Sequence, residues 1–184
     1  QMSQVDVIAP ARFESLTRDD AGERIELTCA VGDGESRTLS TRLLVGADGA
    51  QSSVRGALGI GARTDDYQQR AIVTFVEPER AHGGCAYERF TPDGPVALLP
   101  CTRASCAAVW TLPSERAEQM CAVSEEAFID GLQAAFGQRL GTLKLAGPRG
   151  SYPLARVLCD RAAVDRAVLI GNAGHALHPA AAQG

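Results

Sequence analysis

Two glycine-bearing segments have the residue types and spacing of a ligand-binding site. The first begins Gly46-Ala47-Asp48-Gly49, directly after the apolar run 43–45, and continues to Ser52 and Arg55. An acidic residue and a glycine at the end of a buried strand lie where open α/β sheets bind ligands. Ser52 and Arg55 can cap the next turn or donate hydrogen bonds to a phosphate or carboxylate. The alternative is an ordinary strand-to-helix turn, with Asp48 as a turn residue and Arg55 in solvent.

The second segment covers residues 171–184 and begins Gly171-Asn172-Ala173-Gly174-His175. Its small side chains leave the backbone open to a flat or extended ligand. Pro179 suits the start of a helix, whose free amide groups could face an anion. The alternative is a packing turn rich in glycine and alanine.

The same segment places His175 and His178 three residues apart, as two metal ligands could be. No further histidine or nearby carboxylate completes such a site, so we expect no metal. The sequence also has no Gly-x-Ser-x-Gly elbow, Walker loop or Gly-x-Gly-x-x-Gly motif. The catalytic residues are therefore unknown from the residues alone.

The elements that position both segments are short apolar strands. The runs 43–45 and 167–170 are continuously apolar and each stops at a glycine, which predicts strands buried on both faces. Residues 24–31 alternate apolar and polar side chains, so two or three antiparallel strands are expected between Val5 and Ser40.

The middle of the chain predicts an antiparallel sheet covered by a helix. Apolar runs at 72–76, 85–90, 96–99 and 106–112 are joined by turns that contain glycine or proline. Ser114 and Ser124 are candidate N-caps of helices. After Ser124, apolar residues recur at every fourth position, at Phe128, Leu132 and Phe136, and Gly137 is the expected C-cap.

Composition excludes several classes of function. The 184 residues carry a net charge of -4, and the basic residues are scattered, so nucleic acid is not an expected partner. The apolar runs are far shorter than the roughly 18 residues of a membrane span. Six cysteines without a Cys-x-x-Cys pair suggest mostly buried thiols in a reducing cytoplasm.

The two segments, in this order and at this separation, resemble those of the flavoprotein aromatic hydroxylases, the family of para-hydroxybenzoate hydroxylase. In that family, a strand ending Gly-x-Asp-Gly with a following Ser and Arg precedes a substrate domain. A later run, Gly-Asp-Ala-x-His, then Pro and Gly-Gln-Gly, closes over the flavin. Four further stretches are similar to the ubiquinone-biosynthesis branch: Glu88–Thr91, Gly94–Pro100, Ala135–Gly141 and Ser151–Leu154.

This resemblance implies an FAD-dependent monooxygenase that uses NAD(P)H and oxygen to hydroxylate a polyprenylated phenol. The residues that would serve the cofactor fall into three groups. Asp48, Gly49 and Arg55 would belong to the cofactor and NAD(P)H motif, Gly171 and Asn172 would lie at the FAD ribityl or pyrophosphate, and Pro179, Gln183 and Gly184 would approach the isoalloxazine ring. Asn172 departs from the usual Asp of the family, and an amide brings no charge and adds a donor. Ala182 replaces a usual Gly and adds a methyl group near the flavin.

The implied fold class is α/β (α+β), an FAD-binding Rossmann-like domain with an inserted antiparallel-sheet substrate domain. The expected division is 1–56 and 153–184 for the FAD domain and 57–152 for the substrate domain. Within the substrate domain, Leu98, Pro100 and Trp110 are the expected substrate contacts. The chain is expected to be the central piece of such an enzyme and inactive alone.

Two alternatives stay open beside this hydroxylase. One is another FAD oxidoreductase of the same fold, and the other is a flavin-free binding or assembly module of a quinone-biosynthesis complex. The expected location is the cytoplasm, with peripheral contact at the inner membrane because the substrate would carry a lipid tail.

Overall fold

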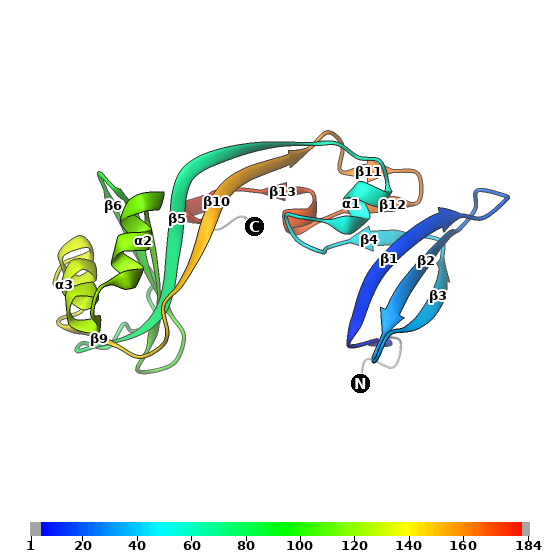
Figure 1. Ribbon diagram of the computed structural model, residues 1–184. Helices are drawn as coiled ribbons and strands as arrows, with labels where there is room; N and C mark the ends of the chain where they lie inside the picture. The colour runs from blue at the N-terminus through cyan, green and yellow to red at the C-terminus, as the bar shows by residue number, and fades with distance from the viewer. Residues whose placement is uncertain (1–4, 182–184) are drawn as a thin grey trace. The chain divides into compact units, whose positions relative to one another are not determined.

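The computed structural model describes residues 5–181, and it divides into two compact units (Figure 1). One unit runs to Asp65 and resumes at Arg156, and the other comprises Asp66–Ala155. Helices and mostly antiparallel sheets build both units, which confirms the mixed α/β fold class. The changes of unit lie at 65/66 and 155/156. The division at 56/57 and 152/153 into an FAD domain and a substrate domain stays a prediction.

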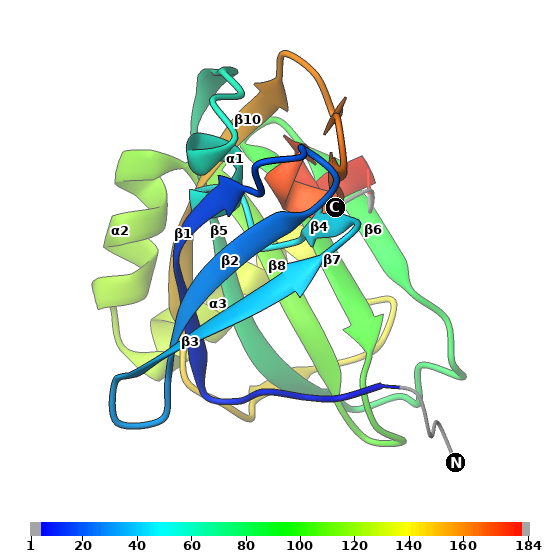
Figure 2. The same ribbon diagram turned by 90° about the vertical axis from the view of Figure 1, so that its right-hand side faces the viewer.

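The first unit opens with an antiparallel three-stranded sheet in the order β1-β2-β3. The strands are β1 (Ala11–Arg18), β2 (Ile25–Val31) and β3 (Glu35–Thr41), which lie side by side in Figure 2. Gly32 adopts a positive φ of 55° in the tight β2–β3 turn, a conformation that glycine accepts without strain. The expected antiparallel strands between Val5 and Ser40 are therefore confirmed.

A second small sheet of this unit has the order β11-β12-β4. It consists of β4 (Leu44–Gly46), β11 (Ala163–Val164) and β12 (Ala167–Leu169), and the helix α1 (Ser53–Ala57) follows β4. Leu44, Val54 and Leu169 form part of its core.

The apolar runs 43–45 and 167–170 were expected to be strands buried on both faces, and this expectation is wrong. Val45 is 47% exposed and Ile170 is 48% exposed, whereas Leu44 and Leu169 are buried. Side chains alternate between the two faces of a strand, and only one face of this sheet is covered by the described residues.

A larger sheet runs in the order β13-β10-β5-β8-β7-β6, with β9 paired to β5. Its strands are β5 (Ala62–Pro78), β6 (Tyr87–Thr91), β7 (Gly94–Pro100), β8 (Cys106–Pro113), β9 (Leu143–Leu145), β10 (Gly150–Cys159) and β13 (His175–Ala176). The pairs β5–β8, β8–β7 and β7–β6 are antiparallel, as the sequence predicts. Both β5 and β10 contribute residues to each unit.

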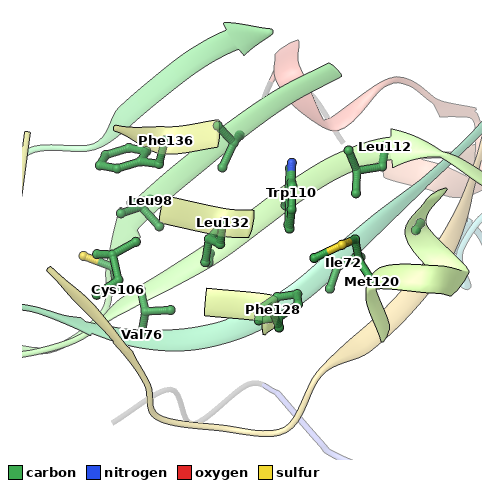
Figure 3. Packing of buried hydrophobic residues seen from close by; sticks show 14 of the residues in the cluster. Ile72, Val76, Leu98, Cys106, Trp110, Leu112, Met120, Phe128, Leu132 and Phe136 are labelled. Carbon is green, nitrogen blue, oxygen red and sulfur yellow. The ribbon is translucent and has the colours of Figure 1, made fainter. Parts of the chain in front are cut away.

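Two helices, α2 (Ser114–Ala122) and α3 (Glu125–Phe136), cover one face of this sheet in the second unit. Phe128, Leu132 and Phe136 of α3 point into the core (Figure 3). Ser124 caps α3 by accepting a hydrogen bond from the Ala127 amide at 3.2 Å, and Gly137 is the C-cap, both as expected. No helix among residues 5–181 is long and apolar enough to cross a membrane.

Ser114 is not the N-cap of α2, so that expectation is wrong. Pro113 occupies the N-cap position in an extended conformation with ψ of 142°, and no side chain caps the helix. Because β8 ends at Pro113, the helix begins one residue earlier than the serine pattern predicts.

The cysteines are free thiols, but most are not buried. Cys29 and Cys106 are buried, Cys121 and Cys159 are half-buried, and Cys85 and Cys101 are exposed. Burial, and secondarily the neighbouring Cys101, raises the pKa of the Cys106 thiol. The expectation of mostly buried thiols is therefore wrong.

Candidate functional site

Parallel pairing of β4 with β12 brings the two glycine-bearing segments together. Val45 pairs with Val168 and Gly46 with Leu169, and the Ile170 amide donates to the Gly46 carbonyl at 2.9 Å. Because the strands are parallel, the residues after Gly46 and those after Ile170 leave the same edge of the sheet. Open α/β sheets bind ligands at this kind of edge.

Gly46 permits the close packing that holds this edge together. A Cβ atom at Gly46 would lie 2.8 Å from Leu169 Cδ2 and 3.0 Å from Val54 Cγ1. A larger residue would therefore push α1 or β12 away from β4. Gly46 begins the first glycine-bearing segment of the sequence. Its packing role could not be read from that segment, because it depends on Leu169, which is distant in the chain.

The Asp48 carboxylate organises the turn before α1. It accepts hydrogen bonds from the Ser52 hydroxyl and from the Val54 amide, the latter at 3.0 Å. Burial pushes the pKa of Asp48 up, but the hydrogen bonds from Ser52 and from the Val54 and Ser53 amides outweigh it, so the pKa is lowered. Ser52 in turn caps α1 by accepting from the Arg55 amide at 2.9 Å. Asp48 is therefore a carboxylate that orders its own loop.

Arg55 links the first segment to the second. Its Nη1 donates to the Ala173 carbonyl at 2.9 Å, and its Nη2 donates to the Ala50 carbonyl at 2.8 Å. The side chain is half-buried, so it is not the solvated arginine of the alternative interpretation. A guanidinium has five N–H donors, so these two hydrogen bonds do not use all of them.

Two glycines leave backbone open at this edge. Gly49 has a φ of 86° and Gly171 a φ of 55°, and a Cβ at either position would meet no atom within 4 Å. Asn172 is exposed within the short 3-10 turn η1 (Gly171–Ala173). The backbone at both glycines thus has open space beside it. Contact of Gly49, Gly171 and Asn172 with a cofactor stays a prediction.

Pro179 is exposed and begins the 3-10 turn η2 (Pro179–Ala181). The Ala180 amide donates to Nδ1 of His178 at 3.2 Å. Gln183 and Gly184, the other two residues expected near the flavin ring, lie outside the described residues. Within residues 5–181, no three His, Cys, Asp or Glu side chains gather closely enough to hold a metal ion.

The expected substrate contacts lie in the second unit, on β7 and β8. Leu98 is fully buried and Trp110 is 5% exposed, and both pack under the helices, whereas Pro100 is half-buried (Figure 3). Burial gives Leu98 and Trp110 a packing role in the described structure. Contact of these three residues with a substrate stays a prediction.

The opposite face of the same strands is the more accessible one. Ala97 pairs with Val109 across β7 and β8, and Phe75 of β5 pairs with Ala107. Phe75 and Leu99 are 45% and 41% exposed, so this face of the sheet presents large apolar side chains. Leu99 falls within the range Val96–Pro100 that the sequence favours as the ring-facing surface, whereas Phe75 was not predicted. Strict alternation with the buried Thr74 and Val76 could have identified Phe75.

Comparison with known proteins gives one matching family and several relatives. Residues 1–184 match the FAD binding domain family. The chain is 43% identical over 178 residues to "Ubiquinone hydroxylase UbiL" of Rhodospirillum rubrum, covering 97% of this chain and 40% of the relative. It is 31% identical over 185 residues to "Ubiquinone biosynthesis monooxygenase COQ6, mitochondrial" of Mus musculus, covering 82% of this chain and 39% of the relative. The chain therefore spans about 40% of the length of these curated relatives.

Solved structures share the fold. The flavin-dependent halogenase CmlS superposes with a TM-score of 0.75 at 19% sequence identity, over 95% of this chain and 32% of the halogenase. At this identity, the likeness establishes the common fold and leaves the reaction open.

Proposed function

Because this chain belongs to the FAD binding domain family, we propose that it is part of an FAD-dependent monooxygenase of ubiquinone biosynthesis. The observation that carries the proposal is the pairing of β4 with β12, which brings both cofactor-type segments to one sheet edge. The two relatives, a ubiquinone hydroxylase and a ubiquinone biosynthesis monooxygenase, support the same reaction class.

The residues at this edge fit FAD. Gly49 and Gly171 expose backbone that an extended phosphate-bearing ligand can approach, and Arg55 supplies a fixed positive charge. Asn172 offers a neutral amide to a hydroxyl or phosphate oxygen, and Asp48 keeps the first loop in shape. Pro179, with Gln183 and Gly184 beyond it, would lie nearest the isoalloxazine ring.

When bound, FAD supplies the redox chemistry, with NAD(P)H as the reductant and oxygen as the oxidant. The residues described here would bind and orient the cofactor, so the protein needs no acid-base triad in this part of the chain. This agrees with a site composed of glycines, one ordered carboxylate and one arginine.

We further propose a polyprenylated phenol as the substrate, specifically a 2-polyprenyl-6-methoxyphenol. The exposed apolar side chains Phe75 and Leu99, together with Ala97 and Val109, form a surface suited to an aromatic ring and a lipid tail. Such a substrate implies peripheral contact with the inner membrane from the cytoplasm, and membership of a quinone-biosynthesis complex would be compatible with it.

Two alternatives make different predictions. Another FAD oxidoreductase of the same fold would bind flavin but would not hydroxylate the phenol, and the halogenase neighbour illustrates that the fold serves other reactions. A flavin-free binding module would carry no flavin at all.

The absorption spectrum of the longest natural protein that contains this chain, recorded beside the 184-residue chain, tests the proposal. We expect a flavin spectrum in the longer protein, with NAD(P)H and oxygen consumed only when the phenol is present and hydroxylated product formed. A colourless longer protein would overturn the proposal, and flavin without hydroxylation would favour the other oxidoreductase.

A pair of glycine variants connects the flavin to this edge. Gly171→Ala and Gly83→Ala impose the same kind of strain, because both glycines have positive φ and open surroundings. We expect FAD to bind at least several-fold more weakly only in Gly171→Ala. Equal affinities would place the cofactor elsewhere.

A further inference from the structure

A crevice of about 390 Å³ is lined by residues of the second unit alone. The β6–β7 hairpin, β8, α2 and α3 all contribute to its walls, with Arg89, Asp93, Trp110, Arg116, Gly131 and Ala135 among the lining residues. This volume is in the range of small-molecule sites.

Trp110, which lines this crevice, carries an unpaired hydrogen-bond donor. Its indole Nε1 is the one buried side-chain nitrogen or oxygen without a hydrogen-bond partner in the described part of the chain. Buried polar groups are nearly always paired, because leaving a donor unpaired costs free energy. Figure 3 shows this nitrogen on the edge of the ring that points away from Phe128.

Packing fixes the indole ring in this orientation. Its centroid lies 5.8 Å from that of Phe128 in an edge-to-face contact. On α3, a Cβ at Gly131 would lie only 3.2 Å from the Trp110 Cη2 atom and 2.7 Å from Met120 Cε. The absence of a side chain at Gly131 therefore makes room for the ring beside the helix.

The charges at the crevice favour an anion. Arg89 and Arg116 both line it and make no ion pair in residues 5–181, and Asp93 is the carboxylate among the lining residues. A guanidinium pairs well with planar oxyanions. By contrast, Pro92, Leu112, Ala134 and Ala135 provide apolar walls.

We propose that this crevice binds a small carboxylate with a flat apolar body. The carboxylate lies between Arg89 and Arg116 and accepts a hydrogen bond from the Trp110 indole, while the apolar body rests against Leu112 and Ala135. The indole N–H is shielded from solvent, so binding includes a shift of rim side chains. The proposal is independent of the flavin site, because all its residues belong to the second unit.

The indole resonance of Trp110 in the ¹⁵N-labelled protein tests this proposal directly. Trp110 is the single tryptophan of the sequence, and loss of the signal in Trp110→Phe assigns it. We titrate with benzoate and, as a neutral probe of the same shape, with benzamide. We expect a saturable shift of the indole resonance with benzoate at millimolar concentration and none with benzamide.

Amino-acid variants distinguish specific binding in the crevice from non-specific binding of benzoate to arginines. We expect the double variant Arg89→Gln and Arg116→Gln to weaken benzoate binding about tenfold or more, whereas Arg103→Gln, an exposed arginine of the same unit away from the crevice, leaves it unchanged. Trp110→Phe keeps an aromatic side chain but lacks the donor, and it should bind benzoate several-fold more weakly by calorimetry. No indole shift, an equal shift with benzamide, or an equal loss in Arg103→Gln would overturn the proposal.

Discussion

At the scale of single residues, Arg55 connects the two ligand-binding segments through backbone carbonyls. Its guanidinium donates at 2.9 Å to Ala173 and at 2.8 Å to Ala50, in a forked geometry that a lysine ammonium cannot reproduce. We expect Arg55→Lys to lower the free energy of unfolding of the first unit by about 1–2 kcal/mol, because hydrogen bonds from a charged group are lost. Amide hydrogen exchange around Ala173 measures this loss.

Arg12→Lys is the matched control, since Arg12 lies in the same unit and its side chain is 82% exposed. It should leave exchange at Ala173 unchanged. If both variants accelerate exchange equally, the link through Arg55 does not stabilise the second segment.

Asp48 gives the same loop a dependence on pH. Its pKa in the folded protein is lowered from 3.8, so the unfolded chain takes up a proton first as the pH falls. The stability that the carboxylate contributes is present above its ordinary pKa and is lost as the pH falls through the lowered folded value. We expect wild type to be more stable than Asp48→Asn at neutral pH, and this difference to shrink in acid.

Chemical denaturation of both proteins at neutral pH and at a pH below 3.8 measures the effect. A stability difference that stays constant over this range would mean that the charge of Asp48 is not what orders the loop.

At the scale of elements, the two candidate caps of α2 and α3 behave differently. Ser124 accepts a hydrogen bond from the Ala127 amide, whereas Ser114 lies inside α2 and caps nothing. We expect Ser124→Ala to cost about 1 kcal/mol of stability. Ser114→Ala should change it by less than about 0.5 kcal/mol, and thermal unfolding of the two variants compares them. Equal losses would contradict the capping assignment.

The same elements explain what the sequence could predict. The helix α3 was predictable because the spacing of Phe128, Leu132 and Phe136, the serine cap and Gly137 all favour one structure. The exposure of Val45 and Ile170 could not be predicted. An apolar run of three or four residues is too short to show whether one face of the strand is covered or both.

For the candidate site, the sequence could predict which loops carry Asp48, Gly49 and Gly171, because motif residues and turn glycines are local signals. The hydrogen bond from Arg55 to the Ala173 carbonyl could not be predicted. Every residue has a carbonyl group, and only tertiary packing determines which one lies beside the arginine. The missing partner of the Trp110 indole is likewise a property of the packed core.

At the scale of the whole molecule, residues 5–181 form two separate hydrophobic cores. One contains Ile25, Val54 and Leu169, and its members all belong to the first unit. The other contains Trp110, Phe128 and Leu132, and its members all belong to the second unit. Each core holds its own site: the glycine-bearing edge lies on the first and the Trp110 crevice on the second.

Separate cores predict separate losses of stability. Leu132 is fully buried in the second core and Leu169 is 3% exposed in the first, so each truncation to alanine leaves a cavity that costs about 2–5 kcal/mol. We expect Leu132→Ala to increase hydrogen exchange in Asp66–Ala155 and Leu169→Ala to increase it in the other unit. Mass spectrometry of peptides from both units measures this, and each variant serves as the control for the other. If either variant increases exchange equally in both units, the two cores unfold together. Such coupling would be explained by β5 and β10, because both strands contribute residues to each unit.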